Sequence, residues 1–256
     1  MAKPEKLARW MRQQVVAAGA RGLLVGLSGG VDSAVVARLA QLATPGGALG
    51  VVLPCEGEPD DEHDATIVAN HFSLATVRIE LAPAYEILGA ELQSALQAVS
   101  APMRATGSAD PLQGRVPLAN TKPRLRMTAL YFLANSLNYL VAGTGNRTGL
   151  TIGYFTKYGD GGVDLLPLGG LVRSQVCAIA RDLGVPAPII DRPPGAGLWP
   201  GQRDEQEMGF TYDELERYLE EGPQSVSPAL AMKIERLTRL SEHKRRLPPM
   251  PEPEEM

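Results

Sequence analysis

The stretch GLSGGVDSA, from Gly26 to Ala34, combines a glycine turn, two hydroxyl groups and one carboxylate. The apolar run just before it predicts a buried strand over 22–27, and the apolar positions after it recur at helical spacing. The stretch is therefore expected to be a loop that opens a helix. Glycines there let the backbone approach an anion, which the free N–H groups and the helix dipole attract, so we interpret the loop as a phosphate-binding loop.

Asp32 distinguishes this loop from the common nucleoside-triphosphate loop, which has a lysine at that place. A carboxylate repels phosphate unless a divalent cation lies between them, so Asp32 indicates Mg²⁺ shared with phosphate oxygens. The pattern is similar to the loop of ATP pyrophosphatases, which split ATP between its α and β phosphates. The alternative is a glycine-rich turn without a ligand, which the full pattern from Ser28 to Ser33 disfavours.

Strands and helices are predicted to alternate along the chain. We expect strands over 22–27, 48–53, 75–81 and 139–142, with helices over 4–18, 60–72, 83–99, 123–138, 173–183, 213–221 and 228–244. This order predicts an α/β fold with a doubly wound parallel sheet flanked by helices and ligands at the carboxyl ends of the strands. Residues 100–118 are expected to form a mobile loop, and residues 143–170 a long functional loop.

Composition limits the organisation and the partners. A chain of 256 residues, 44% of them hydrophobic, is long enough for one large domain, expected over 1–247, with a flexible proline- and glutamate-rich tail at 248–256. The net charge of −4 argues against a general nucleic-acid binder. Cys55 and Cys177 are too few for a disulfide framework, and no signal-peptide core or membrane span is evident. These features predict a cytoplasmic protein with no membrane or nucleic-acid partner.

The segment NTKPRLRM, residues 120–127, places three cations at the start of a predicted helix. Cations oppose the helix dipole there, so the cluster is best explained by a bound anion, although a solvated basic turn is the alternative. Arg124 and Arg126 lie two positions apart and point to different sides of the helix. We expect one of them to bind a ligand and the other to pack or pair.

Three more segments carry polar groups suited to a nucleotide substrate. In GTGNRTG, residues 143–149, Thr144 follows a predicted strand and faces the crevice beside the phosphate loop. The segment 153–168, GYFTKYGDGGVDLLPL, offers aromatic faces, a lysine and carboxylates, although its glycines also suit a hairpin turn. The basic segment EHKRRLP, residues 242–248, is explained equally well by charge complementing the end of a helix.

Taken in order, SGGVDS, NTKPRLRM, GTGN, YFTKYGDGGVDLLPL, TYDELERYLEEG and EHKR resemble the ammonia-dependent NAD synthetase family over nearly the whole chain. The resemblance implies an adenine nucleotide alpha hydrolase-like, Rossmann-like fold and a homodimer. It implies that ATP adenylates the carboxylate of deamido-NAD, releasing pyrophosphate, and that ammonia then displaces AMP to form NAD. Free ammonia and a separate glutaminase both remain open as the nitrogen source.

The resemblance also assigns roles by motif position. It implies catalytic roles for Ser28, Asp32 and Lys157, with Asp32 binding Mg²⁺. The residues expected to bind ATP are Gly26, Leu27, Ser28, Gly29, Gly30, Val31, Asp32, Ser33, Thr144 and Arg173. Those expected to bind deamido-NAD are Arg124, Lys157, Asp164, His243 and Lys244.

Three positions depart from the family pattern. Gly149 stands where the family has a glutamate that binds Mg²⁺, Gly195 where it has a serine or threonine, and Arg173 where it has a lysine. Water can replace one Mg²⁺ ligand, and arginine keeps the charge but changes the geometry. Two rivals to the synthetase reading therefore stay open: an adenylating relative with another substrate, and a nucleotide-binding regulatory subunit without catalysis.

Overall fold

The computed structural model describes residues 3–99 and 111–252. Its sheet contains four parallel strands in the order β3-β2-β1-β4: β1 (Gly22–Leu27), β2 (Ala48–Val52), β3 (Thr76–Arg78) and β4 (Tyr139–Val141). A further parallel bridge joins Ala142 to Leu165. The central strand β1 pairs with β2 on one side and β4 on the other, so the segments that follow these three strands meet at one edge of the sheet.

Helices connect the strands and continue beyond the last one. The α-helices are α1 (Pro4–Ala17), α2 (Val31–Ala43), α3 (Pro59–His71), α4 (Ala82–Ala98), α5 (Pro111–Ala119), α6 (Thr121–Leu137), α7 (Arg147–Ile152), α8 (Arg173–Asp182), α9 (Ala187–Ile190), α10 (Asp204–Met208), α11 (Tyr212–Glu221) and α12 (Pro228–Leu240). Short 3₁₀ helices occupy Pro223–Ser225 and Glu242–Lys244.

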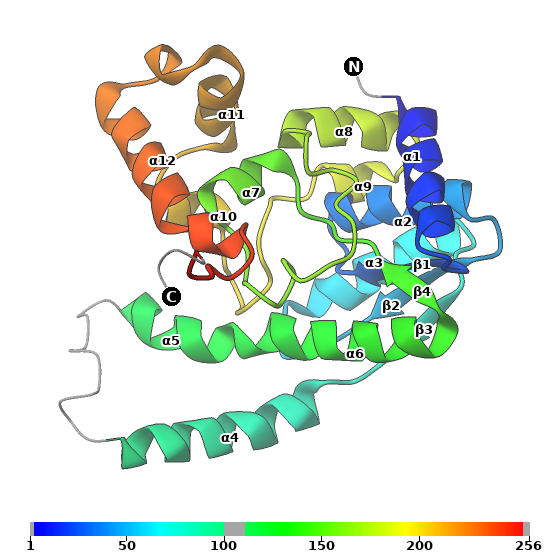
Figure 1. Cartoon of the computed structure of the whole chain (residues 1–256), viewed down its shortest axis with the longest axis horizontal. Helices are drawn as coiled ribbons and strands as arrows, with labels where there is room; N and C mark the ends of the chain where they lie inside the picture. The colour runs from blue at the N-terminus through cyan, green and yellow to red at the C-terminus, as the bar shows by residue number, and fades with distance from the viewer. Residues whose placement is uncertain (1–2, 100–110, 253–256) are drawn as a thin grey trace.

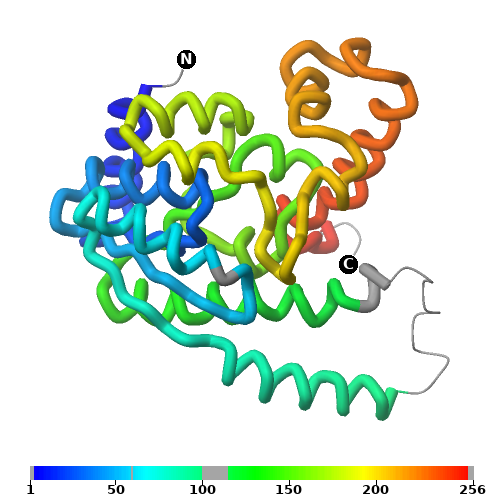
Figure 2. The backbone as a smooth tube through the Cα atoms, turned by 180° about the vertical axis from the view of Figure 1, so that it is seen from behind, coloured from blue at the N-terminus to red at the C-terminus, as the bar shows by residue number. Residues whose placement is uncertain are grey.

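Both faces of the sheet are covered (Figures 1 and 2). Leu23 of β1 belongs to a core shared with α1, α2, α3, α8 and α9, whereas its neighbour Leu24 belongs to a core shared with α4 and α6. Successive side chains of a strand point to opposite faces, so a strand buried on both faces must be apolar throughout. This explains the uninterrupted apolar run at 22–27 and confirms the predicted doubly wound parallel sheet.

A third apolar cluster places the C-terminal helices beside the edge of the sheet. It joins Ile152 of α7 to Met208, Phe210, Leu215 and Ile234 of the α10–α12 region. Helices α11 and α12 stand away from the sheet in Figure 1 and contact it through α7. Residues far along the sequence are thereby brought next to the segment after β4.

Several predicted boundaries differ from those observed. The expected strand over 75–81 is reduced to three exposed residues, because β3 lies at the edge of the sheet. The expectation of a loop throughout 100–118 is wrong for its second half, where α5 forms and Leu118 packs against α4 and α6; residues 100–110 lie outside the described part. The loop expected over 143–170 contains α7, and the last helix ends at Leu240.

The C-terminal residues carry no regular secondary structure where they are described. Residues 248–252 contain neither helix nor strand, and residues 253–256 lie outside the described part, so a flexible tail stays a prediction. Among the described residues, none of the helices combines the length and apolar character that crossing a membrane requires.

Candidate functional site

The phosphate-binding loop joins the end of β1 to the start of α2, as predicted. Gly29 has φ +80°, and a Cβ there would lie 2.6 Å from the carbonyl oxygen of Asp61. Both the backbone conformation and the close approach of α3 therefore require glycine at this position. The Ser33 hydroxyl donates to the carbonyl of Gly30 at 2.8 Å and lies 3.2 Å from the Ser28 hydroxyl, so the loop is held in shape from within.

Asp32 extends from the first turn of α2 toward the end of β4. Its Oδ1 accepts a hydrogen bond from Asn146 Nδ2 at 2.9 Å, and its Oδ2 lies 3.8 Å from Arg173 Nη1. Burial raises the pKa of the Asp32 carboxyl, while the Asn146 hydrogen bond and the Arg173 charge oppose that shift. The carboxylate thus sits at the cavity wall with one neutral and one cationic partner.

Asn146 also organises the segment that contains Gly149. Its side chain caps α7 by accepting a hydrogen bond from the Gly149 N–H at 3.1 Å. The Thr148 hydroxyl accepts a hydrogen bond from the Arg173 N–H at 3.1 Å, which ties α7 to the start of α8. The ends of β1 and β4 are therefore linked through polar side chains beside Asp32.

These elements surround one large cavity of about 720 Å³. It lies at the carboxyl ends of the strands, where a doubly wound sheet binds ligands. Its walls come from the phosphate loop, the segment after β2, helix α6, the segment 143–160, the segment 192–204 and Lys244. The cavity contains Gly26, Leu27, Ser28, Gly30, Val31, Asp32, Thr144 and Arg173 of the residues expected to bind ATP.

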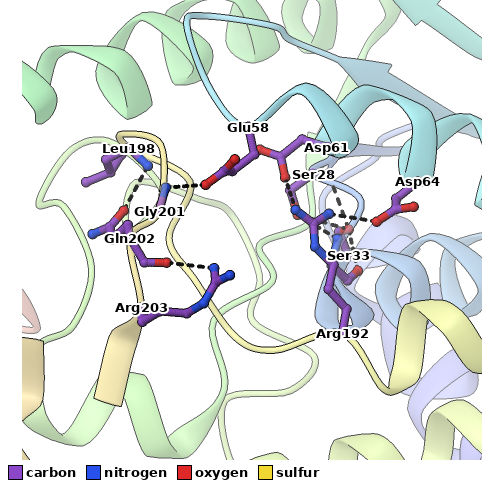
Figure 3. A network of polar contacts seen from close by, with 11 residues as sticks. Ser28, Ser33, Glu58, Asp61, Asp64, Arg192, Leu198, Gly201, Gln202 and Arg203 are labelled. Carbon is purple, nitrogen blue, oxygen red and sulfur yellow. Dashed lines mark hydrogen bonds and ion pairs between the residues drawn. The ribbon is translucent and has the colours of Figure 1, made fainter. Parts of the chain in front are cut away.

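The segment 191–203 borders the cavity, and Figure 3 shows its contacts with α3 and the residue just before it. The Arg192 guanidinium lies 2.5 Å from Asp61 Oδ1 and 2.8 Å from Asp64 Oδ2. Farther along, the Leu198 carbonyl accepts a hydrogen bond from the buried Lys122 ammonium at 3.0 Å, and the Gly201 N–H donates to Glu58. These long-range contacts make the segment a cover over the phosphate loop.

Gly195 in this covering segment has a local reason to be glycine. A Cβ at that position would lie 2.9 Å from the carbonyl oxygen of Gln202. The serine or threonine of the family pattern would therefore require the segment to shift. Glycine at residue 195 therefore lacks the hydroxyl of the family pattern, and it also lets the backbone pass close to the Gln202 carbonyl.

Acidic and aromatic side chains next to Arg173 form another part of the cavity wall. Asp204 is 6% exposed and accepts a hydrogen bond from the Tyr212 hydroxyl at 2.7 Å, while the Tyr154 hydroxyl donates to Glu207 at 2.5 Å. Burial raises the pKa of Asp204, against the lowering effect of the tyrosine hydrogen bonds. Arg173 lies 5.2 Å from the centre of the Tyr212 ring, so this cluster also supports the cation beside Asp32.

The structure separates the residues expected to bind deamido-NAD into two groups. Lys244 lines the cavity and donates to the carbonyls of Gly153 and Phe155, both at 2.8 Å. Arg124, Lys157 and His243 lie outside the cavity wall, where Arg124 Nε donates to the Lys157 carbonyl at 3.2 Å and Lys157 Nζ donates to the His243 carbonyl at 2.6 Å.

Asp164 also lies outside the cavity wall. Its carboxylate accepts hydrogen bonds from the Tyr131 hydroxyl at 2.9 Å and from the Val141 N–H at 2.7 Å. In this structure it supports the end of β4. Gly29 and Ser33 likewise shape the phosphate loop without lining the cavity.

Sequence reasoning missed several cavity residues. Arg126, Asp160, Asp204 and Tyr212 all line the cavity, yet none was assigned to a ligand. Asp160 and Arg126 lie within the motifs quoted above, so their motifs gave a signal but not their orientation. Tyr212 lies within the quoted motif TYDELERYLEEG, but it and Asp204 reach the cavity only through the packing of the C-terminal helices, which is not a local feature of the sequence.

Comparison with known proteins agrees with this geometry. The family model described as NAD synthase matches residues 4–248. A protein of Carboxydothermus hydrogenoformans, named NH(3)-dependent NAD(+) synthetase, is 50% identical over 249 residues, which is 97% of this chain and 96% of the relative. Another of that name, from Syntrophomonas wolfei, is 44% identical over 95% of this chain and 93% of its own length.

Solved structures share the fold over almost the whole chain. NMN synthetase from Francisella tularensis superposes with a TM-score of 0.84 at 36% identity, covering 97% of this chain and 96% of that one. NH3-dependent NAD synthetase from Campylobacter jejuni superposes with a TM-score of 0.75 at 25% identity, covering 97% of each chain. With the matched family model spanning nearly every described element, the chain belongs to the NAD synthase family.

Proposed function

We propose that this protein uses ATP and ammonia to convert the nicotinate carboxylate of deamido-NAD into the carboxamide of NAD. A carboxylate oxygen attacks the α-phosphorus of ATP, the bond to the bridging oxygen of the β-phosphate breaks, and pyrophosphate leaves. Ammonia then attacks the activated carbonyl carbon and loses a proton, and AMP leaves with the carboxylate oxygen. Adenylation is needed because a carboxylate oxygen is otherwise a poor leaving group.

The observation that carries the proposal is the phosphate loop with Asp32 in place of the usual lysine, opening into the cavity at the carboxyl edge of the sheet. Such a loop holds a triphosphate without a lysine directed at the terminal phosphate. The enzyme's contribution is then mainly the positioning of two anions and the neutralisation of their charge.

For ATP, we assign the phosphates to the loop from Gly26 to Ser33, with Ser28 contributing its hydroxyl. Thr144 and Arg173 line the same cavity, with Arg173 next to Asp32 of the loop, and would contact the same nucleotide. In the present structure the Arg173 charge compensates Asp32. Its guanidinium is therefore already placed beside the position that phosphate charge would occupy.

The residues present fit a bound Mg²⁺. Asp32 is a carboxylate at the cavity wall, and Mg²⁺ commonly rests on one or two carboxylates together with substrate phosphates and water. Among residues 3–99 and 111–252, no group of three His, Cys, Asp or Glu side chains is placed to hold a metal ion, so we assign the remaining ligands of the ion to ATP and water. When bound, the ion would lower the repulsion between Asp32 and the phosphates.

For deamido-NAD, we assign contacts to Lys244 at the cavity wall and to the basic group at its rim, namely Arg124, Lys157 and His243. We assign the cations Arg124 and Lys157 of this group to the phosphates of a bound dinucleotide, and Lys157 lies 5.2 Å from the Tyr158 ring centre. Asp164, which supports β4, is assigned a contact with a ribose hydroxyl from the family pattern alone.

A homodimer completes the proposal. The exposed side of α4 carries Ile87, Leu92 and Leu96 with exposed fractions of 70%, 44% and 60%, and Phe132 on the neighbouring α6 is 72% exposed. Apolar side chains gathered in this way on two adjacent helices mark an interaction surface. We propose that a second copy of the chain covers this face.

A second candidate substrate is the mononucleotide in place of the dinucleotide. The specific observation is the likeness to NMN synthetase of Francisella tularensis, with a TM-score of 0.84. The carboxylate chemistry would be the same in both cases. Initial rates with deamido-NAD and with nicotinate mononucleotide, compared as kcat/KM, decide between them.

Product analysis tests the function itself. The protein is incubated with ATP, Mg²⁺, deamido-NAD and ammonium, and NAD, AMP and pyrophosphate are quantified. We expect equal amounts of all three, and near-complete loss of pyrophosphate release in a folded Asp32→Ala variant. Omitting ammonium or adding glutamine with a separate glutaminase identifies the nitrogen source. ADP and phosphate as products would contradict the proposal.

A further inference from the structure

Arg126 of helix α6 lines the cavity with most of its guanidinium unused. Its Nε donates to the carbonyl of Leu53 at 3.1 Å. Within residues 3–99 and 111–252, no carboxylate lies within 4.0 Å of this guanidinium, and its Nη groups have no protein hydrogen-bond acceptor. Four of its five N–H donors therefore remain for another partner.

Neighbouring cations of the same cavity region are bound by the protein. Arg192 has two carboxylate partners, and Lys122 donates to two carbonyls and lies 3.6 Å from Glu56. Burial lowers the pKa of Arg126, which reflects the free-energy cost of desolvating its charge. The carboxylates of Asp61 and Asp160 attract this half-buried cation, but neither forms an ion pair with it within 4.0 Å. An anionic ligand in direct contact would offset more of the desolvation cost.

The position of Arg126 relates it to the phosphate loop. Leu53, which accepts its hydrogen bond, directly follows β2, the strand next to β1, and both segments line the cavity. Gly57 lies close by, and a Cβ there would be 4.0 Å from Arg126 Nη2. A longer side chain at residue 57 would compete for the space in front of the guanidinium, whereas glycine leaves it open.

Resting on the function proposed above, we infer that Arg126 binds substrate: its two Nη groups hold anionic oxygens where the carboxylate meets the α-phosphate of ATP. Adenylation joins these two anions, so a permanent positive charge between them reduces their repulsion as the new bond forms. A planar guanidinium suits this place because it can donate two parallel hydrogen bonds to a carboxylate or a phosphate.

Binding measurements on Arg126→Met distinguish the two sources of anionic oxygen. Isothermal titration calorimetry is performed with a non-hydrolysable ATP analogue, with deamido-NAD and with NAD, whose carboxamide is neutral. If the carboxylate is the partner, deamido-NAD should bind about 10- to 100-fold more weakly while NAD binds as before. If the phosphate is the partner, the ATP analogue should show that loss.

Stability and charge provide independent readouts. Arg126→Met removes a half-buried cation that has no ion-pair partner within 4.0 Å among the described residues, so its thermal midpoint without ligand should stay the same or rise. Loss of a stabilising structural arginine would lower that midpoint. Arg126→Lys keeps one charge but loses the paired donors and should bind with intermediate affinity. Arg9→Met, at an exposed arginine of α1, is the matched control and should change neither property.

The outcomes separate this inference from the proposed function. Unchanged affinity of Arg126→Met for both the ATP analogue and deamido-NAD, in a parent protein that makes NAD, would overturn the role of Arg126. If Arg126→Met does not fold, parent-like affinity in Arg126→Lys has the same meaning. A parent protein that makes no NAD would instead refute the proposed function.

Discussion

Replacing Gly149 by glutamate tests the magnesium site at the position where the family's carboxylate is absent. Gly149 is the third residue of α7, lines the cavity and has no positive φ. A Cβ there would lie 3.6 Å from the Tyr154 carbonyl oxygen and 4.0 Å from Asn146 Oδ1, which is ordinary contact distance. The loop therefore admits a side chain without backbone strain. The Asn146 side chain is hydrogen-bonded both to the Gly149 N–H and to Asp32. A glutamate at residue 149 would therefore be attached to the backbone close to Asp32, the proposed metal ligand.

Two effects must be separated in this variant. Replacing a helical glycine by alanine should stabilise the protein by about 0.5–1 kcal/mol, so Gly149→Ala measures the helix effect alone. A glutamate near a helix N-terminus should stabilise the folded protein by a further amount of about 0.3–1 kcal/mol. Without a metal ion, repulsion between this glutamate and Asp32 opposes that stabilisation. An added anionic ligand should strengthen Mg²⁺ binding by at least about 1.4 kcal/mol. This corresponds to a roughly tenfold lower Mg²⁺ concentration at half-saturation.

The assay is initial NAD formation against free Mg²⁺ at fixed ATP for the parent, Gly149→Ala and Gly149→Glu. We expect the tenfold fall for glutamate and parent-like Mg²⁺ dependence for alanine. Calorimetric binding of Mg²⁺ with a non-hydrolysable ATP analogue checks the same change without turnover. A folded Gly149→Glu protein that binds the analogue normally and keeps the parent's Mg²⁺ dependence would show that residue 149 does not face the ion.

Three further predictions concern the thiols, a buried carboxyl and the subunit contact. Burial raises the pKa of both Cys55 and Cys177, which disfavours the nucleophilic thiolate, so a folded double alanine variant should keep its NAD synthesis rate; complete loss would reveal a thiol nucleophile. Burial also raises the pKa of Asp204 above 3.8, so the native state binds this proton more tightly than the unfolded state, and stability falls as pH rises through the native pKa. We measure the unfolding free energy of Asp204→Asn and of the parent by urea unfolding. The variant's value minus the parent's should increase as pH rises from about 4 to about 8, and a pH-independent difference would contradict the assignment. Because Leu92 and Leu96 are exposed in the single chain, changing both to glutamate should leave folding intact but convert a dimer to a monomer in light scattering; a parent that is already monomeric and active would refute the dimer.

Local pattern was sufficient for the sheet and the phosphate loop. The apolar run of β1, the glycine turn and the helical spacing after it each act over a few residues, so the sequence predicted where Asp32 would lie. Helix α7 was missed because its capping by Asn146 is hidden within a glycine-rich segment. The cover at 191–203 could not be predicted, since Arg192 contacts Asp61 and Asp64, more than a hundred residues earlier.

The choice between Arg124 and Arg126 shows where helical spacing could have gone further. Arg126 shares a row of four-residue spacing with Lys122 and Leu130, both of which are buried. Arg124 shares its row with the exposed Thr128. That spacing indicates which arginine faces the core, but only the assembled cavity shows that, among the residues the structure describes, the inward one has no carboxylate within ion-pair distance.

The most direct test of adenylation follows the oxygen atoms of the substrate carboxylate. Deamido-NAD carrying heavy oxygen in both carboxylate positions is converted with ATP, Mg²⁺ and ammonium, and the products are analysed by mass spectrometry. The proposed mechanism predicts that each NAD formed is accompanied by one AMP containing one heavy oxygen, with none in pyrophosphate. Unlabelled AMP, or heavy oxygen released as water or inorganic phosphate, would contradict the formation of an adenylated carboxylate.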